Sequence, residues 1–216
     1  MSDALFKRLT KVAGPVSRET FDELRLFENE FRRWSARINL VAPSTREDIW
    51  ERHILDSAQL MPITGMATSW LDLGSGGGFP GAIVALMLKG RQGAHIDLVE
   101  SNQKKSAFLR TVLGQLGAPA HIHAARIESL YKSIRNPDIV TARALAGLSS
   151  LLALTEPWLS AGTRAFFHKG REYAVEVEES IQHWHYDLVE HPSVTEHGAV
   201  ILEIANLRRR QFDVTD

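Results

Sequence analysis

Residues 71–81 constrain the fold of this chain more than any other segment. They read Leu-Asp-Leu-Gly-Ser-Gly-Gly-Gly-Phe-Pro-Gly, and the apolar run Ala82–Leu88 follows them. Glycine adopts the positive φ values of sharp turns and lets a backbone approach a ligand closely, at a cost in conformational entropy. Four glycines within residues 74–78 therefore predict a strand, a tight ligand-binding turn and then a helix, in preference to a turn without a ligand.

An acidic residue follows at the distance expected for a nucleoside-binding site. Glu100 comes directly after the apolar segment His95–Val99, and a carboxylate at such a strand end accepts hydrogen bonds from ribose hydroxyls. Phe79 replaces the third glycine of the dinucleotide pattern G-x-G-x-x-G. The spacing of Asp72, Gly74, Gly76 and Gly78 instead resembles the first motif of class I methyltransferases, which implies S-adenosylmethionine as the cofactor.

From residue 70 onward, short apolar segments alternate with segments of helical length, such as Asn102–Leu116 and Leu148–Leu159. This alternation predicts an α/β fold, a Rossmann-like and mostly parallel seven-stranded sheet with helices on both faces. The last two strands are joined by a short segment with Pro and Gly, which indicates an antiparallel hairpin at one edge. The expected strands are Trp70–Leu73, His95–Val99, His121–Ala124, Asp138–Thr141, Thr163–His168, His183–Glu190 and Ala199–Asn206.

The segment before residue 69 has a different pattern of apolar residues. Apolar residues recur at three- and four-residue spacing over Ser17–Arg37, which predicts a helix with one packing face. A second helix is expected to run to about Leu60, with Pro62 and Gly65 ending it. We therefore expect a helical N-terminal cap over residues 1–68 and an S-adenosylmethionine-binding domain over residues 69–216.

Composition removes several kinds of chemistry. The chain has 216 residues and no cysteine, so thiolate zinc sites, iron–sulfur clusters and cysteine nucleophiles are excluded. The pairs His121/His123 and His183/His185 lack supporting ligands, and no metal site is expected. The net charge of −1 means that a nucleic acid would have to meet a local basic patch. No apolar stretch has the length of a membrane span, so we expect a cytoplasmic protein without membrane contact.

Several segments together, in order over nearly the whole chain, resemble the bacterial RsmG family, also called GidB. The helix motif His-Ile-Leu-Asp-Ser and the motif Gly-Phe-Pro-Gly are the most specific of them. The segments are Asn39-Leu40, Arg52 to Ser57, Asp72 to Gly81, Lys104-Lys105 with Phe108-Leu109-Arg110, Thr141-Ala142-Arg143-Ala144, and Lys169-Gly170.

The resemblance implies methyl transfer from S-adenosylmethionine to N7 of a guanine in 16S ribosomal RNA, in the decoding region of the small subunit. It implies that naked 16S ribosomal RNA or a small-subunit particle is the partner, and we expect the protein to be a monomer. It also implies these cofactor contacts: Gly74 and Phe79 in the glycine loop, Glu100 at the ribose, Ile127 and Glu128 at the adenine, and Arg143 at the mouth of the site.

Guanine N7 carries a lone pair and no proton, so its methylation needs no general base. Which residue, if any, is catalytic stays open, with Asp56, Arg143 and His53 as candidates. Asp56 is a candidate for stabilising the positive charge that develops on the guanine, although His53 and Asp56 equally suit hydrogen bonds that join the cap to the other domain. The candidate phosphate-binding residues are Lys104, Lys105, Arg143, Lys169 and Arg171.

Three other functions stay open at this stage. A class I methyltransferase that acts on a small molecule or a protein has the same fold. A nicotinamide-dependent oxidoreductase is disfavoured by Phe79 and by the predicted terminal hairpin. A non-catalytic RNA-binding module needs neither the glycine loop nor Glu100.

Overall fold

The computed structural model describes residues 2–41 and 48–210, and its centre is one seven-stranded sheet. The strand order is β3-β2-β1-β4-β5-β7-β6, which confirms the predicted mostly parallel α/β sheet. Each predicted strand is present, with its ends shifted by no more than three residues. The strands are β1 (Ser69–Leu73), β2 (His95–Val99), β3 (Ala120–His123), β4 (Ile139–Arg143), β5 (Arg164–Lys169), β6 (Trp184–Pro192) and β7 (Val200–Arg209).

Strand direction divides the sheet into two parts. Strands β1 to β5 are parallel to one another, whereas β7 pairs antiparallel with both β5 and β6. The predicted hairpin at the edge is therefore confirmed. The order of the strands reverses between β1 and β4, and the connections that follow these two strands run to opposite faces of the sheet. This leaves a crevice at their carboxyl ends, which is where open α/β sheets bind ligands.

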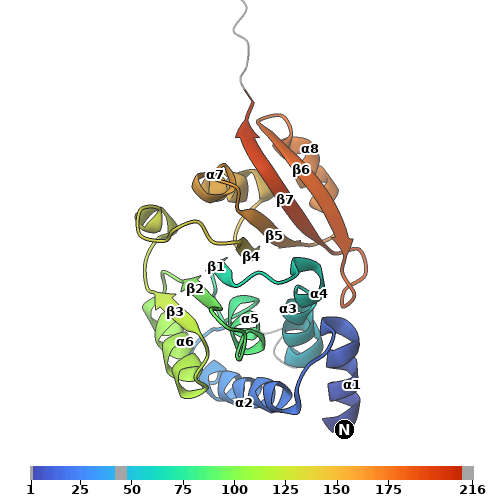
Figure 1. Cartoon of the computed structure of the whole chain (residues 1–216), viewed down its shortest axis with the longest axis vertical. Helices are drawn as coiled ribbons and strands as arrows, with labels where there is room; N and C mark the ends of the chain where they lie inside the picture. Colours follow the sequence, from blue (N-terminus) through green and yellow to red (C-terminus); the bar gives the residue numbers. More distant parts are fainter. Residues whose placement is uncertain (1, 42–47, 211–216) are drawn as a thin grey trace, which may run out of the picture.

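Helices cover both faces of the sheet (Figure 1). On one face lie α5 (Gly81–Met87) and α6 (Gln103–Gln115), and on the other lie α7 (Leu148–Leu159) and α8 (Tyr173–Ser180). Alternating side chains of each strand serve the two faces, as the pleat requires. Phe166 belongs to the hydrophobic core on the face covered by α5 and α6, and its neighbour Phe167 belongs to the core on the face covered by α7.

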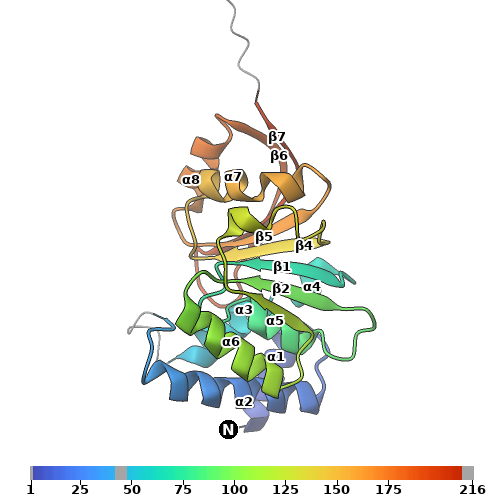
Figure 2. The ribbon, with the colours of Figure 1, turned by 90° about the vertical axis from the view of Figure 1, so that its left-hand side faces the viewer.

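The N-terminal helices add a further layer. Figure 2 shows α2 (Arg18–Ser35) lying across the outside of α5 and α6, with α1 (Ser2–Ala13) beside it. Phe27 and Phe31 of α2 are fully buried against Phe108 of α6, so the apolar stripe is the packing face that its spacing predicts. These helices share one hydrophobic core with the sheet. The boundary at residue 68 between a cap and a second domain stays a prediction.

The second predicted helix differs in detail. Trp50–Leu55 is a π-helical turn, α3 (Asp56–Ala58) continues it, and α4 (Met61–Thr64) follows. Pro62 does not end the helix, because it lies in the first turn of α4, where its missing N–H has no partner to lose. Gly65, with a φ of 66°, ends it. Among residues 2–41 and 48–210, no helix is both long and apolar enough to cross a bilayer.

Candidate active site

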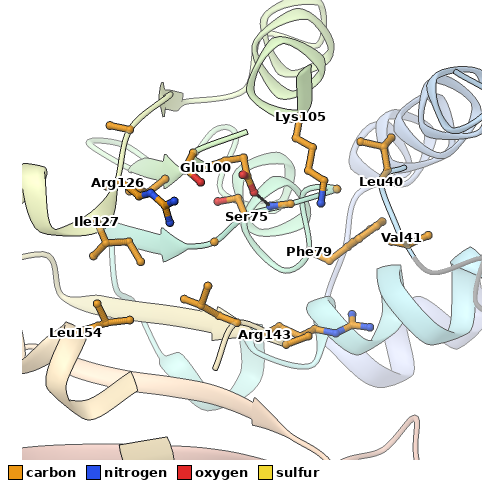
Figure 3. A pocket seen from close by; sticks show the side chains of 18 of the residues that line it. Leu40, Val41, Ser75, Phe79, Glu100, Lys105, Arg126, Ile127, Arg143 and Leu154 are labelled. Carbon is orange, nitrogen blue, oxygen red and sulfur yellow. Dashed lines mark hydrogen bonds between the residues drawn. The ribbon is translucent and has the colours of Figure 1, made fainter. Parts of the chain in front are cut away.

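A cavity of about 660 Å³ opens at the carboxyl ends of β1, β2 and β4. This is the crevice that the strand order predicts, and its volume falls in the range of small-molecule sites. Figure 3 shows Glu100 and Ser75 at its centre, Ile127 and Leu154 towards one end, and Leu40 and Val41 at the other. The cavity therefore joins the sheet, α7 and the segment that follows α2.

The glycine loop forms the floor of this cavity, and its glycines have different tasks. Gly74 and Gly76 line the cavity and have positive φ values of 67° and 54°. Gly78, with a φ of 96°, lies outside the cavity wall, where a Cβ atom would come within 2.7 Å of Ala82 and 3.1 Å of Phe27. The close approach of α2 and α5 thus explains Gly78, and a cofactor contact is not needed to explain it.

Asp72 supports the loop from beneath. It is fully buried, does not line the cavity, and accepts a 2.7 Å hydrogen bond from the Thr141 hydroxyl of β4. A Cβ atom at Gly81 would lie 2.5 Å from its carboxylate, so Gly81 makes room for it. Burial raises the pKa of Asp72 to about 6. The structure thus gives Asp72 a supporting position beneath the loop, and the cofactor contact expected from the motif stays a prediction.

Glu100 occupies the position expected of a ribose-binding acid. One carboxylate oxygen accepts from the Gly76 N–H at 2.9 Å (Figure 3). The other accepts from the Asn102 N–H at 2.6 Å. A carboxylate accepts about four hydrogen bonds, so lone pairs remain for ribose hydroxyls in the cavity. The two backbone donors fix the direction of the carboxylate before any ligand binds.

The loop after β3 forms one end of the cavity. Ile127 and Glu128 line it, as the resemblance implies, and they open the 3₁₀ helix Ile127–Leu130. Arg126 lines it as well and is exposed. Leu154 of α7 faces Ile127 across this end in Figure 3, so two apolar side chains are available for the faces of an adenine.

Arg143, at the end of β4, is held by the segment that contains the other two catalytic candidates. Its guanidinium lies 3.1 Å from the Asp56 carboxylate, donates to the Arg52 carbonyl at 3.0 Å and donates to His53 Nδ1 at 2.7 Å. The remaining Asp56 oxygen accepts from Thr195 and Gln59. This favours the joining role that the sequence left open, since Asp56 is already neutralised and has little charge to offer a cationic guanine.

The protonation states in this cluster follow from burial. Burial, with a further contribution from the Arg143 charge, lowers the pKa of His53 to about 4. Because His53 Nδ1 accepts a hydrogen bond, its proton resides on Nε2, and the neutral ring stacks on Phe79 with centroids 4.8 Å apart. Burial likewise lowers the pKa of His168, whose Nε2 donates to the Asp56 carbonyl. Both imidazoles are therefore neutral near pH 7.

The predicted phosphate-binding residues divide into free and engaged cations. Lys105 of α6 lines the cavity, and Lys104 beside it is exposed; neither forms an ion pair with a residue that the structure describes. Arg171 is exposed as well. Lys169 is 8% exposed and pairs with Glu176, and Arg143 is bound as described above. Lys104, Lys105 and Arg171 stay predicted phosphate contacts, whereas the engagement of Lys169 and Arg143 leaves them poorly suited to that role.

Sequence reasoning missed part of the apolar wall. Val41 at the rim, Leu145 after β4 and Leu154 on α7 line the cavity, and none belongs to a polar or glycine-rich motif. Leu145 covers the loop so closely that a Cβ atom at Gly74 would lie 2.6 Å from it. The only sequence signal for Leu145 is its place two residues after the end of β4, at the edge of the sheet where ligands bind.

The geometry fits S-adenosylmethionine in three respects. Glu100 retains acceptor capacity for a ribose, apolar side chains flank the loop after β3, and the Gly74–Gly77 backbone leaves an open floor between that end and Phe79. The ligand would thus lie with its adenine at Ile127 and its amino-acid end towards Phe79 and His53.

Comparisons with known proteins agree with this site. The family model for GidB, rRNA small subunit methyltransferase G, matches residues 20–205. A protein named ribosomal RNA small subunit methyltransferase G from Chelativorans sp. (strain BNC1) is 59% identical, covering 94% of this chain and 97% of the relative. Its namesake from Brucella canis is 56% identical, with 97% and 98% covered.

Solved structures of lower identity share the fold. A putative O-methyltransferase from Klebsiella pneumoniae superposes with a TM-score of 0.57 at 13% identity, over 94% of this chain and 96% of that one. Cofactor-bound Rv0187 from MTB gives 0.57 at 12% identity, over 94% and 95%. With the fold, the site geometry and relatives of this similarity in agreement, the chain belongs to the GidB family of rRNA small subunit methyltransferases G.

Proposed function

We propose that this protein transfers a methyl group from S-adenosylmethionine to N7 of a guanine in 16S ribosomal RNA, in the decoding region of the small subunit. The observation that carries the proposal is the agreement of the cavity around Glu100 and the glycine loop with a family match over residues 20–205. Family membership favours an RNA acceptor over the small-molecule and protein acceptors that the fold alone allows.

When bound, S-adenosylmethionine supplies the activated methyl group. The residues of this chain then have three tasks. Glu100 and the loop after β3 fix the nucleoside. Phe79 and Leu145 exclude water from the reacting end, which strengthens electrostatic interactions there. The Arg143–Asp56 pair holds the end of β4 against the π-helical turn and so keeps the acceptor side of the site in place.

The chemistry demands no proton transfer from the protein. Guanine N7 has no proton to lose, and the buried His53 and His168 are neutral near pH 7, with pKa values lowered by burial. Catalysis then rests on placement of the two reactants in line and within reach of each other. The monomeric state and the cytoplasmic location expected from the sequence stay predictions.

The test is to incubate the protein with radiolabelled S-adenosylmethionine and small ribosomal subunits that lack the modification, and to map the label by cleavage at 7-methylguanine. Glu100→Ala removes the ribose acceptor, so we expect a loss of about tenfold to a hundredfold in cofactor affinity. Asp97→Asn on β2, the strand that Glu100 follows, is the matched control, because Asp97 bonds to His123 and does not line the cavity.

The proposal predicts label at one guanine, lost or strongly reduced in Glu100→Ala and retained in Asp97→Asn. Cofactor binding without label in the RNA would contradict the RNA acceptor and leave only the methyltransferase fold. Equal activity of Glu100→Ala and the unchanged protein would contradict the cofactor geometry.

A further inference from the structure

A second cavity adjoins the first at the loop that follows β4, residues 144–147. It has a volume of about 430 Å³ and lies between this loop, the end of β5, α8 and the β6–β7 connection. Arg143, Ala144 and Leu145 line both cavities. Ala144 has a φ of 53°, which is a strained conformation for a residue with a Cβ atom. These three residues therefore belong to the wall of both cavities, and the nucleoside site lies next to the second cavity.

An ion pair between the buried Lys169 and the partly exposed Glu176 lines this second cavity. Lys169 Nζ donates to a Glu176 oxygen at 2.6 Å and to the Ala146 carbonyl at 2.9 Å. The same Glu176 oxygen accepts from the Leu148 N–H at 2.6 Å. An ammonium group has three N–H donors and a carboxylate two oxygens. One donor of Lys169 and the second oxygen of Glu176 thus form no hydrogen bond within residues 2–41 and 48–210.

The free N–H of Lys169 and the free oxygen of Glu176 form a pair with a definite chemical complement. It places a donor beside an acceptor, and guanine presents the matching acceptor O6 beside the donor N1–H on its Watson–Crick edge. Adenine presents the reverse, a donor at N6 and an acceptor at N1, which would face an ammonium with a donor and a carboxylate with a lone pair. Enzymes that modify an extruded base read that base by hydrogen bonds to this edge.

We propose that the second cavity binds the target guanine and that Lys169 and Glu176 select guanine over adenine. The proposal rests on the proposed function and specifies its acceptor site. Guanine N7 lies next to O6, on the far side of O6 from N1. A base whose O6 and N1 meet Lys169 and Glu176 can therefore turn N7 towards Arg143, Ala144 and Leu145, where this cavity adjoins the first one and its methyl donor.

The proposal changes the assignment of Lys169. The sequence groups it with phosphate-binding cations, but a residue 8% exposed and bound to a carboxylate has no surface to offer a backbone phosphate. The same burial suits base recognition, because a hydrogen bond that excludes water discriminates strongly when a wrong base leaves its partner unpaired. Lys169 and Glu176 are specificity residues in this arrangement, and neither exchanges a proton in the reaction.

Equilibrium binding of nucleotides to the full chain, saturated with S-adenosylhomocysteine, tests the proposal without methyl transfer. The probes are the 5′-monophosphates of guanosine, inosine, adenosine and 2-aminopurine riboside. Inosine keeps O6 and N1–H and lacks the 2-amino group, whereas 2-aminopurine keeps the amino group and lacks both. We expect guanosine and inosine nucleotides to bind alike, and the other two about tenfold or more weakly.

Glu176→Gln should bring the guanosine and adenosine affinities together, since a neutral amide no longer prefers a donor. Glu178→Gln is the matched control, because Glu178 is exposed on the same helix and lines neither cavity. Unchanged affinity of Glu176→Gln for S-adenosylhomocysteine shows that the variant is folded. The comparison of inosine with 2-aminopurine in the unchanged protein needs no variant at all.

Equal binding of guanosine and adenosine nucleotides by the unchanged protein would overturn the proposal. So would a guanosine preference that survives in Glu176→Gln, or no detectable guanosine nucleotide binding at millimolar concentration. Small-subunit methylation by the unchanged protein separates the two proposals. If label still appears at 7-methylguanine, the proposed function stands and only the assignment of the second cavity fails.

Discussion

Asp72 lies at the base of the glycine loop, and its ionisation is linked to folding. Its carboxyl has a pKa of about 6 in the folded protein, raised by burial from an ordinary value of 3.8. Between these pH values the folded state binds more protons than the unfolded state, so stability falls as the pH rises through this window. Above pH 6 the loss of stability is essentially complete and amounts to roughly 3 kcal/mol.

Asp72→Asn removes this ionisation and keeps an oxygen for the Thr141 hydroxyl. We expect the free energy of unfolding of the variant, relative to the unchanged protein, to increase by up to about 3 kcal/mol between pH 4 and pH 7. Urea unfolding of both proteins at several pH values measures this difference. A difference that does not change with pH would show that Asp72 ionises in the folded protein as it does in the unfolded chain.

The same scale shows what sequence can and cannot assign to single side chains. Glu100 follows a strand and a glycine loop, and this order alone placed it correctly in the cavity. Arg143, His53 and Asp56 were also identified as a group of interest, yet their mutual bonds arise between residues about 90 positions apart. Such pairing depends on the tertiary approach of β4 to the π-helical turn, which a pattern of residue types does not encode.

At the scale of elements, α2 determines how well the glycine loop is supported. Phe31 is fully buried, lies 5.2 Å from the Phe79 ring, and fills the space against Gly77, where a Cβ atom would come within 2.8 Å of it. The helix therefore serves the site directly, through an aromatic contact with the loop that holds the cofactor. A defect in this packing should affect stability and cofactor binding together.

Phe31→Ala should lower the free energy of unfolding by about 3–5 kcal/mol, since it removes a buried ring and leaves a cavity. It should also weaken S-adenosylhomocysteine binding, because Phe79 and Gly77 lose their support. Leu26→Ala on the same helix is the control; Leu26 is 53% exposed, and its truncation should change stability by about 0.5 kcal/mol at most. Denaturant unfolding and calorimetric titration measure both effects. Unchanged cofactor affinity in a folded Phe31→Ala protein would contradict the coupling.

Elements with a regular period were predictable, and irregular ones were not. The predicted bounds of α7 (Leu148–Leu159) and of β2 (His95–Val99) are those that the structure has. Both segments have a continuous apolar pattern with a clear break at each end. The π-helical turn at Trp50–Leu55 has a wider spacing than 3.6 residues, so periodicity does not reveal it. Helix α1 was not predicted, although Leu5, Leu9 and Val12 repeat at helical spacing, because its stripe is short and packs only once α2 and α3 are in place.

For the whole molecule, the first cavity is where separate parts of the chain meet. Leu40 and Val41 follow α2, Glu100 follows β2, and Leu154 belongs to α7 on the other face of the sheet. A ligand that contacts all of these stabilises the entire fold, because it binds only when they are together.

S-adenosylhomocysteine at a concentration one hundred times its Kd should stabilise the protein by about 2.7 kcal/mol. For a chain of this size that corresponds to an increase in Tm of roughly 5–10 °C. Differential scanning calorimetry across ligand concentrations measures the shift. The increase should be much smaller for Glu100→Ala at the same concentration, and an equal increase would show that the ligand does not use Glu100.

The wall shared by the two cavities also has a thermodynamic consequence. If a bound cofactor shifts Arg143, Ala144 or Leu145, it changes the affinity of the acceptor side by some factor. Linkage then requires that an acceptor in the second cavity change the cofactor affinity by the same factor. Cooperativity measured with the ligands added in one order therefore fixes its value for the other order. The coupling through this loop therefore favours neither order, and a preferred order of binding has to come from the separate affinities of the two ligands or from their rates of access.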